Sequence, residues 1–136
     1  MNALTSAASP ISVLVVDEEP SILVFIARVL DAGGMRALLA RSGSEALEIA
    51  ERKFVSIDMI LGNAAILKLH EPELLNRLRQ IRPGVRDLSM AACVDGGVVR
   101  IQLMVGGPGS ESAVCDDGLV EAIRKSAGTP LVRRAG

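Results

Sequence analysis

Short apolar runs alternate with stretches of helical periodicity along most of the chain. The run from Ile11 to Val16 is continuous and apolar, which is typical of a strand buried on both faces. After it, Ile22, Ile26 and Val29 recur at helical spacing on one face. The same reading predicts strands at 11–16, 35–40, 55–61, 87–92 and 112–115. It predicts helices at about 20–32, 43–52, 74–82, 98–105 and 116–125.

Local signals support several of these helix ends. Ser42 and Glu45 form a capping-box pattern, which opens the second helix. Pro83 and Gly84 stop the third helix. The fourth helix is predicted from four residues at helical spacing: Val98, Ile101, Gln102 and Val105.

Five strands that alternate with five helices predict an α/β fold. In such folds the strands form a parallel sheet, helices cover both of its faces, and the crossovers are right-handed. We expect one folded domain at 11–127, between loose tails at 1–10 and 128–136. Working residues in open sheets of this kind lie beyond the carboxyl ends of the strands.

Composition excludes several classes of function. Phe25 and Phe54 are the only aromatic residues, and the net charge of −1 comes with no long basic run, so we expect no nucleic-acid binding. No apolar run is long enough to cross a bilayer and no signal peptide is visible, so we expect a cytoplasmic protein without membrane contact. Cys93 and Cys115 form no disulfide framework or zinc site, although a redox pair at the sheet edge stays open.

Three segments resemble receiver domains of two-component response regulators. Residues 13–20 (Val-Leu-Val-Val-Asp-Glu-Glu-Pro) are similar to the first strand, acidic pair and proline-started helix of that family. Residues 41–48 resemble the entry to its second helix, and residues 81–84 resemble the end of its third. The resemblance implies a three-layer, doubly wound (βα)5 domain of the flavodoxin-like or CheY-like class. Its five-stranded parallel sheet would have the order 2-1-3-4-5.

The resemblance also implies a chemistry. In receivers, carboxylates hold Mg²⁺, and an aspartate at the end of the third strand accepts a phosphoryl group from the phosphohistidine of a kinase. In this chain Asp17 and Glu18 match the acidic pair, while Asn63 falls on the acceptor position. Asp58 is the alternative acceptor, but we expect it to lie inside the third strand instead of at its exit. An asparagine amide has no anionic oxygen that could act as the nucleophile.

Two further groups of the receiver site are missing. At the switch position on the fourth strand, where receivers carry a Ser or Thr, this chain has Ala91. The only threonines lie in the tails. Receivers also carry a lysine on the fifth strand, but no lysine occurs between Lys68 and Lys125 in this chain. No cofactor is certain; a weak Mg²⁺ site of Asp17, Glu18 and Asn63 is conceivable from the donor types.

We therefore expect a receiver whose phosphorylation site is lost, and no enzymatic activity. It would act as a phosphorylation-independent interaction module that binds a sensor histidine kinase, a phosphotransfer protein or another response regulator. The resemblance also implies a homodimer through the fourth helix, fifth strand and fifth helix. Two alternatives stay open: a pseudo-receiver that responds to a ligand or metal, and a receiver that is phosphorylated at a non-standard site.

Overall fold

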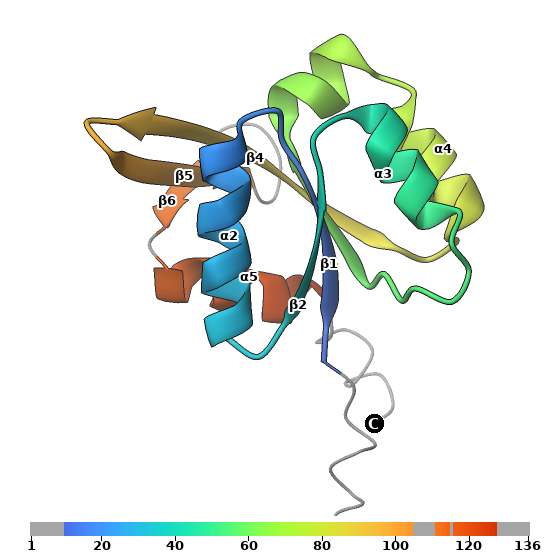
Figure 1. Ribbon diagram of the computed structural model, residues 1–136, viewed down its shortest axis with the longest axis horizontal. Helices are drawn as coiled ribbons and strands as arrows, with labels where there is room; N and C mark the ends of the chain where they lie inside the picture. Colours follow the sequence, from blue (N-terminus) through green and yellow to red (C-terminus); the bar gives the residue numbers. More distant parts are fainter. Residues whose placement is uncertain (1–9, 105–110, 115, 128–136) are drawn as a thin grey trace, which may run out of the picture.

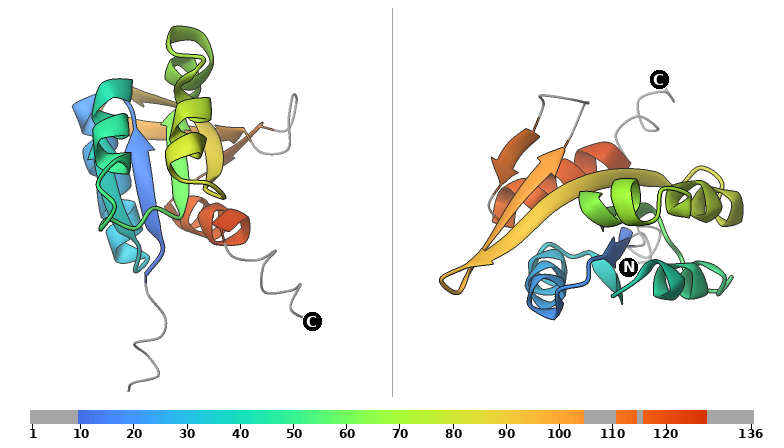
Figure 2. Two further views of the ribbon diagram at one scale, coloured as in Figure 1. Left: turned by 90° about the vertical axis from the view of Figure 1, so that its right-hand side faces the viewer. Right: turned by 90° about the horizontal axis from the view of Figure 1, so that it is seen from above.

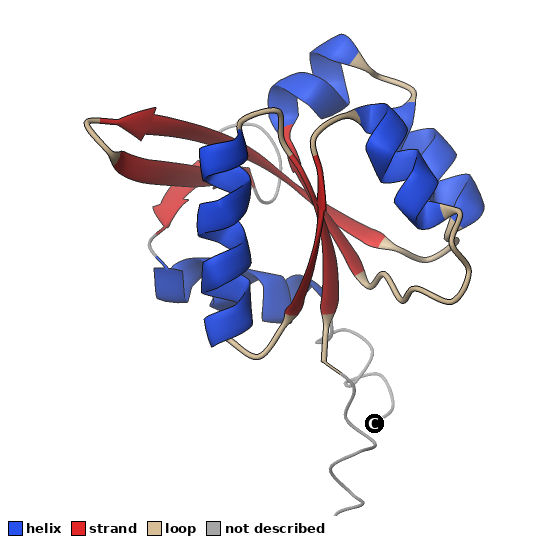
Figure 3. Cartoon of the chain, viewed as in Figure 1, coloured by secondary structure: helices blue, strands red, loops and turns tan. Residues whose placement is uncertain are grey.

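A computed structural model describes residues 10–104, 111–114 and 116–127, and its elements run from Ser12 to Ala127 (Figures 1 and 3). The tails expected at 1–10 and 128–136 lie almost wholly outside the described residues. The strands are β1 (Ser12–Val16), β2 (Arg36–Ala40), β3 (Met59–Asn63), β4 (Arg86–Asp95), β5 (Val98–Met104) and β6 (Glu111–Val114). The helices are α2 (Pro20–Ala32), α3 (Gly43–Ala50), the π-helix η1 (Ala65–His70), α4 (Leu74–Ile81) and α5 (Asp116–Ala127).

The strands form one sheet of the order β2-β1-β3-β4-β5-β6. Strands β2, β1, β3 and β4 are parallel, whereas β5 and β6 each pair antiparallel with the preceding strand. The predicted order 2-1-3-4-5 and the doubly wound α/β class are thus confirmed, but the sheet is mixed instead of wholly parallel, and the segment expected as the fifth strand is the sixth. Among the described residues, no helix is long and apolar enough to cross a membrane.

Side-chain alternation along the central strands builds two separate cores. On β1, Val13 and Val15 pack in the core that includes α2 and α5. Leu14 and Val16 point to the other face of the sheet, where they pack with α3 and α4. All four side chains are fully buried, as expected for a parallel strand covered on both faces. The three-layer architecture therefore follows from the continuous apolar run that the sequence shows.

The predicted capping box at the start of α3 is confirmed. The Ser42 hydroxyl accepts a hydrogen bond from the Glu45 N–H at 3.1 Å. The Glu45 carboxylate reaches back and accepts from the Arg41 N–H at 2.7 Å. The first-turn N–H of Glu45 is therefore satisfied by the Ser42 cap, and the bond to Arg41, the residue before the cap, holds the chain where it enters α3.

The helix predicted over 98–105 is wrong, because this segment forms the strand β5. Gly96 and Gly97 both have positive φ values, 59° and 83°, as a two-residue hairpin turn requires. After the turn, Ile101 and Leu103 are buried while Arg100 and Gln102 are exposed, which is the period of a strand. Figure 2 shows the resulting β4–β5 hairpin extending beyond the helices.

This correction also changes the expected interface. The dimer surface implied by the family resemblance needs a helix between the fourth and fifth strands. Two glycines stand in that place, and they connect β4 directly to β5. The homodimer predicted through a fourth helix, fifth strand and fifth helix therefore cannot form in that way, because no helix lies between β4 and β5.

Substitutions on β5 test the hairpin against the helix. We expect Leu103→Ala to lower the free energy of unfolding by about 2–5 kcal/mol, because Leu103 is 1% exposed and its truncation leaves a cavity. The matched variant Gln102→Ala should change it by less than about 0.5 kcal/mol, since Gln102 faces solvent. Urea unfolding of both variants is the measurement. If this segment were a helix with Gln102 inward, Gln102→Ala would lower the free energy of unfolding more than Leu103→Ala does.

Candidate functional site

The carboxyl ends of β1 and β3 bring the acidic pair and Asn63 together. Strands β1 and β3 are adjacent and parallel, with Val16 paired to Gly62, so the next residues along each strand meet at the same sheet edge. Asp17, Glu18 and Asn63 line one hollow of about 570 Å³. The other residues lining it are Glu19, Ser21, Ile22, Ala65, Ile66, His70, Ala92, Cys93 and Val94.

Asp17 is a buried carboxylate with a partner on each oxygen. Its residue is only 2% exposed. Its Oδ1 accepts a hydrogen bond from the Glu19 N–H at 2.9 Å, and its Oδ2 accepts one from the Asn63 Nδ2 at 3.1 Å. Burying a carboxylate without such partners would be costly, so these two donors are what allows Asp17 to stay inside.

Asn63 is held at both ends of its amide. While Nδ2 donates to Asp17, its Oδ1 accepts from the Ala65 N–H at 2.8 Å. The chemistry fixes this orientation, because an ionised carboxylate only accepts and a backbone N–H only donates. In the reverse orientation the amide oxygen would face the Asp17 carboxylate and the N–H₂ group would face the Ala65 N–H, so neither hydrogen bond could form.

Each of these side chains also shapes the turn that follows it. Asp17 accepts from the N–H two residues on, and so does Asn63, a pattern typical of Asx turns. The first turn leads from β1 into α2, and the second leads from β3 into η1. The Asn63–Asp17 hydrogen bond therefore cross-links two chain reversals that are 46 residues apart.

Glu18 points to solvent, unlike its neighbour. Its side chain is 69% exposed, and its Oε2 lies 3.9 Å from the Nδ1 of His70, whose side chain is 57% exposed. A pair this exposed contributes little to stability. His70 is exposed, and η1 brings it to the hollow, which the sequence alone did not indicate. No residue pattern in the sequence marks that π-helix.

The arrangement does not fit a divalent cation held by Asp17, Glu18 and Asn63. Mg²⁺ needs several oxygen ligands that point at one centre. Here the Asn63 N–H₂ group faces the acidic residue, and its oxygen is turned away toward Ala65. Among the residues that the structure describes, no group of three or more His, Cys, Asp or Glu side chains could hold a metal ion.

The part of β4 that lines the hollow offers no switch hydroxyl. It contributes Ala92, Cys93 and Val94. Ala91, the residue predicted at the switch position, is exposed and does not line the hollow, whereas Ser89 is buried and paired in register with Gly62. The β4 residues that line the hollow therefore carry no hydroxyl group that could hold a phosphoryl group.

No lysine lines the hollow in the described part of the chain either. Lys125 lies on α5 and borders another depression, together with Arg86, Asp87 and Ser126. Arg86 is the first residue of β4, so that depression lies at the amino ends of the strands, away from Asn63. Lys68 lies on η1, whose residues Ala65, Ile66 and His70 line the hollow, but Lys68 itself is not among the lining residues.

Asp58 lies at the opposite edge of the sheet. The third strand begins at Met59, four residues later than predicted, so Asp58 precedes the strand and does not lie inside it. Its Oδ2 accepts a hydrogen bond from the Ser12 N–H at 2.8 Å, and its own N–H donates to the Ser12 carbonyl. Asp58 therefore ties the start of β3 to the start of β1, far from the hollow.

The structure also places Cys93 and the arginines Arg79 and Arg82. Cys93 is exposed with a free thiol, and Cys115 lies outside the described residues, so the redox pair stays untested. Arg79 pairs with Asp87, and Arg82 donates to the carbonyl oxygens of Ala50 and Arg52. These arginines serve the fold and form no open basic face.

Comparison with known proteins finds receiver domains among those that are similar to this chain. No protein-family model matches the chain. It is 26% identical, over 96 residues, to the sensor kinase CckA of Brucella abortus (strain 2308), a match that covers 71% of this chain and 10% of the kinase. It is also similar to the crystal structure of a response regulator receiver domain protein from Clostridium thermocellum, with a TM-score of 0.52 and 29% identity. That alignment covers 58% of this chain and 63% of the other.

The chain is a receiver-like domain. A third likeness supports the fold alone: a CheY-like receiver domain protein from Methanospirillum hungatei JF-1, with a TM-score of 0.55 and 22% identity, over 65% of this chain and 69% of that one. The chain spans about a tenth of the length of the kinase that it matches. The likeness therefore establishes the receiver-like domain and not the activity of a whole kinase.

Two substitutions at Asn63 test whether its amide holds the site together. We expect Asn63→Asp to lower the free energy of unfolding by about 1–3 kcal/mol without metal, because a second carboxylate then faces the buried Asp17 with no donor between them. Mg²⁺ should recover much of this loss, since oxygen ligands would now converge. Thermal unfolding with EDTA and with Mg²⁺ is the measurement.

The matched control is Asn63→Ala. It also removes the donor to Asp17, so we expect a loss of about 1–3 kcal/mol, but it supplies no ligand and Mg²⁺ should not recover it. The wild-type protein should be insensitive to Mg²⁺. A wild-type midpoint that rises with Mg²⁺ would contradict this account of the site.

Proposed function

We propose that this receiver-like domain works in two-component signalling without being phosphorylated, as a protein-interaction module that catalyses no reaction. The observation that carries the proposal is the Asn63–Asp17 hydrogen bond inside the site. A receiver needs an open carboxylate at the acceptor position. Here that position holds a neutral amide, and the amide is committed to the acidic residue beside it.

Phosphoryl transfer would need three contributions that the described site does not combine. The first is a nucleophilic oxygen with negative charge, which the Asn63 amide lacks. The second is a positive charge close to the transferred group, and the third is a hydroxyl donor on β4. The hollow is instead lined by Glu18 and Glu19 on one side and by Ala92, Cys93 and Val94 on the other. Additional negative charge would be poorly stabilised there.

The partner that we propose is a sensor histidine kinase, a phosphotransfer protein or another response regulator. The similarity to part of a sensor kinase supports this class of partner. Binding would not depend on a phosphorylated state, because the two turns that border the site are already held by the Asp17 and Asn63 side chains. The signal would be carried by the presence of the domain and not by its chemical modification.

A phosphodonor experiment tests this proposal. Incubation with acetyl phosphate or an active sensor kinase in Mg²⁺ should leave the intact mass unchanged, because no acceptor carboxylate is present at the site. A functional receiver domain in the same mixture serves as the positive control. The affinity for a bound partner, measured by calorimetry, should be the same with and without the phosphodonor. A stable phosphoryl adduct at Asn63 or Asp58 would refute the proposal.

A further inference from the structure

The outer half of β4 has a strand on only one of its two sides. On the side of β3, the pairing ends where Asn63 meets Met90, whereas β4 continues through Ala91–Asp95. On the other side, this continuation stays paired with β5 as far as the hairpin turn. Figure 2 shows this part of the hairpin reaching beyond the helices. The backbone groups of Ala91–Asp95 that point toward the β3 side therefore have no strand partner among the described residues.

The hollow at the end of β3 borders this open edge. Its lining includes three consecutive residues of β4, namely Ala92, Cys93 and Val94. Side chains alternate between the two faces of a strand, so a lining of three neighbours in a row indicates that the hollow borders the edge of β4 and not only one face. Its volume of about 570 Å³ leaves room beside the edge.

The open edge lacks the features that commonly protect strand edges. Proteins block such edges with lysine, with proline or with a bulge. Residues 91–95 read Ala-Ala-Cys-Val-Asp and contain no lysine or proline. The register with β5 runs one-to-one from Ser89 opposite Met104 to Asp95 opposite Val98, so this stretch has no bulge. The edge is therefore a regular template for an added strand.

The hollow beside the edge is acidic. Glu18 and Glu19 line it, and both residues are exposed. Among the described residues of the lining, the only basic side chain is that of His70, and none is a lysine or arginine. Asp17 already has a partner on each of its oxygens. A strand that enters the hollow therefore meets two carboxylates in contact with water, which favour a cationic side chain.

We propose that an extended segment of a partner protein, rich in lysine or arginine, adds a strand to Ala91–Asp95. Its backbone pairs with the free groups of β4, and its cationic side chains lie beside Glu18 and Glu19. Strand addition draws affinity from main-chain hydrogen bonds and specificity from side chains. The inference rests on the proposed function, because it assigns a binding surface to the interaction module.

A second copy of the chain fits this edge less well. If the open edges of two copies paired, the added strand would be Ala91–Asp95 itself, whose only charged residue is Asp95. It would bring negative charge toward a hollow that already holds Glu18 and Glu19. Like charges brought together in this way oppose association.

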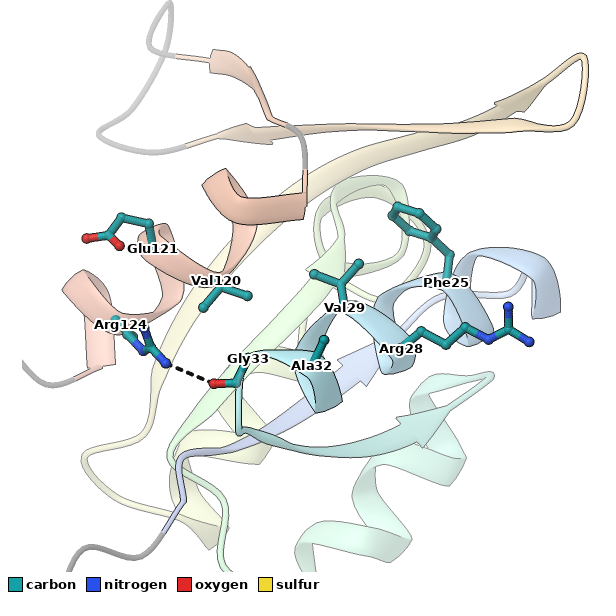
Figure 4. Close-up of a pocket in the computed structure, with 8 residues that line it drawn as sticks. All are labelled: Phe25, Arg28, Val29, Ala32, Gly33, Val120, Glu121 and Arg124. Carbon is teal, nitrogen blue, oxygen red and sulfur yellow. Dashed lines mark hydrogen bonds between the residues drawn. The ribbon is translucent and has the colours of Figure 1, made fainter.

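Two other surfaces suit a cationic strand less well. The groove between α2 and α5 has a volume of about 730 Å³, but helices form its walls, and its lining carries Arg28 and Arg124 with one acid, Glu121 (Figure 4). Helices satisfy most of their backbone groups internally, so they offer no edge to a strand. The outer edge of β5 has no described strand partner over Val98–Arg100, but it is shorter and carries Arg100 itself.

A designed peptide tests the site. The probe is a fluorescently labelled octapeptide of four Lys-Val repeats, because valine favours an extended chain and the lysines then lie on one face. Fluorescence anisotropy should show saturable binding to the wild-type protein. A Glu-Val octapeptide should bind at least about tenfold more weakly, because its charge is reversed. The Lys-Val peptide with every backbone amide N-methylated should also bind at least about tenfold more weakly, because it cannot donate to a strand edge.

Neutral variants of the acidic lining supply a matched comparison. Glu18→Gln with Glu19→Gln should raise the dissociation constant of the Lys-Val peptide roughly three- to tenfold, because two solvent-screened attractions are lost. Glu48→Gln with Glu51→Gln removes two exposed charges at α3 and at its C-terminal end, away from the hollow. This control pair should leave the dissociation constant unchanged.

Hydrogen exchange distinguishes an added strand from simple charge attraction. In the free protein, the amides of Ala91–Asp95 that face the open edge should exchange rapidly with water. The bound Lys-Val peptide should slow their exchange, because they then donate to the added strand. The N-methylated peptide at the same concentration should not slow it.

These readings are separate from the phosphodonor experiment, because the peptide is added to protein that has met no phosphodonor. A phosphoryl adduct would refute the proposed function and leave the peptide result as measured. The absence of saturable binding would overturn the strand-addition site alone. So would binding that Glu18→Gln with Glu19→Gln does not weaken, binding that leaves exchange at residues 91–95 unchanged, or a dimer that protects these residues without peptide.

Discussion

A buried carboxylate needs hydrogen-bond donors from the protein, and the buried Asp17 places this requirement on the two turns beside it. One of its oxygens is satisfied by the chain turning from β1 into α2, through the Glu19 N–H. The other needs a donor from a different part of the chain. In a receiver, a bound cation and its ligands would meet that need. In this chain Asn63 meets it with a neutral amide, and the same amide shapes the turn from β3 into η1 through the Ala65 N–H.

This single substitution has opposite effects on stability and on chemistry. For stability, an amide beside a buried carboxylate removes the repulsion that a second carboxylate would create, so the sheet edge holds without a metal. For chemistry, the same amide occupies the acceptor position with a group that is no nucleophile. The loss of the phosphorylation switch that we propose would therefore leave a fold with the receiver layout and a well-satisfied site.

Much of this could be predicted from the sequence. The apolar run before Asp17 predicted a strand buried on both faces, and Ser42 with Glu45 predicted the start of α3; the structure confirms both. Asn63 was placed correctly at the end of β3, because the position of a strand end depends on local residues. Its bond to Asp17 could not be predicted, since that depends on how two distant turns meet.

The failures have physical reasons too. Val98, Ile101 and Gln102 fit a helical period by coincidence, while Gly96 and Gly97 carried the stronger signal, a two-residue turn that joins antiparallel strands. The π-helix η1 has no sequence signature that we could use, so the approach of His70 to the hollow was missed.

The most direct measurement of the central claim is the side-chain amide signal of Asn63 in a ¹⁵N-resolved NMR spectrum, assigned with Asn63→Ala. If the amide is locked between Asp17 and Ala65, one of its protons should exchange slowly with water, and the signal should stay in place as Mg²⁺ is added. Rapid exchange of both protons, or a shift that saturates with Mg²⁺, would show that Asn63 is free to turn toward a cation. That result would contradict the account.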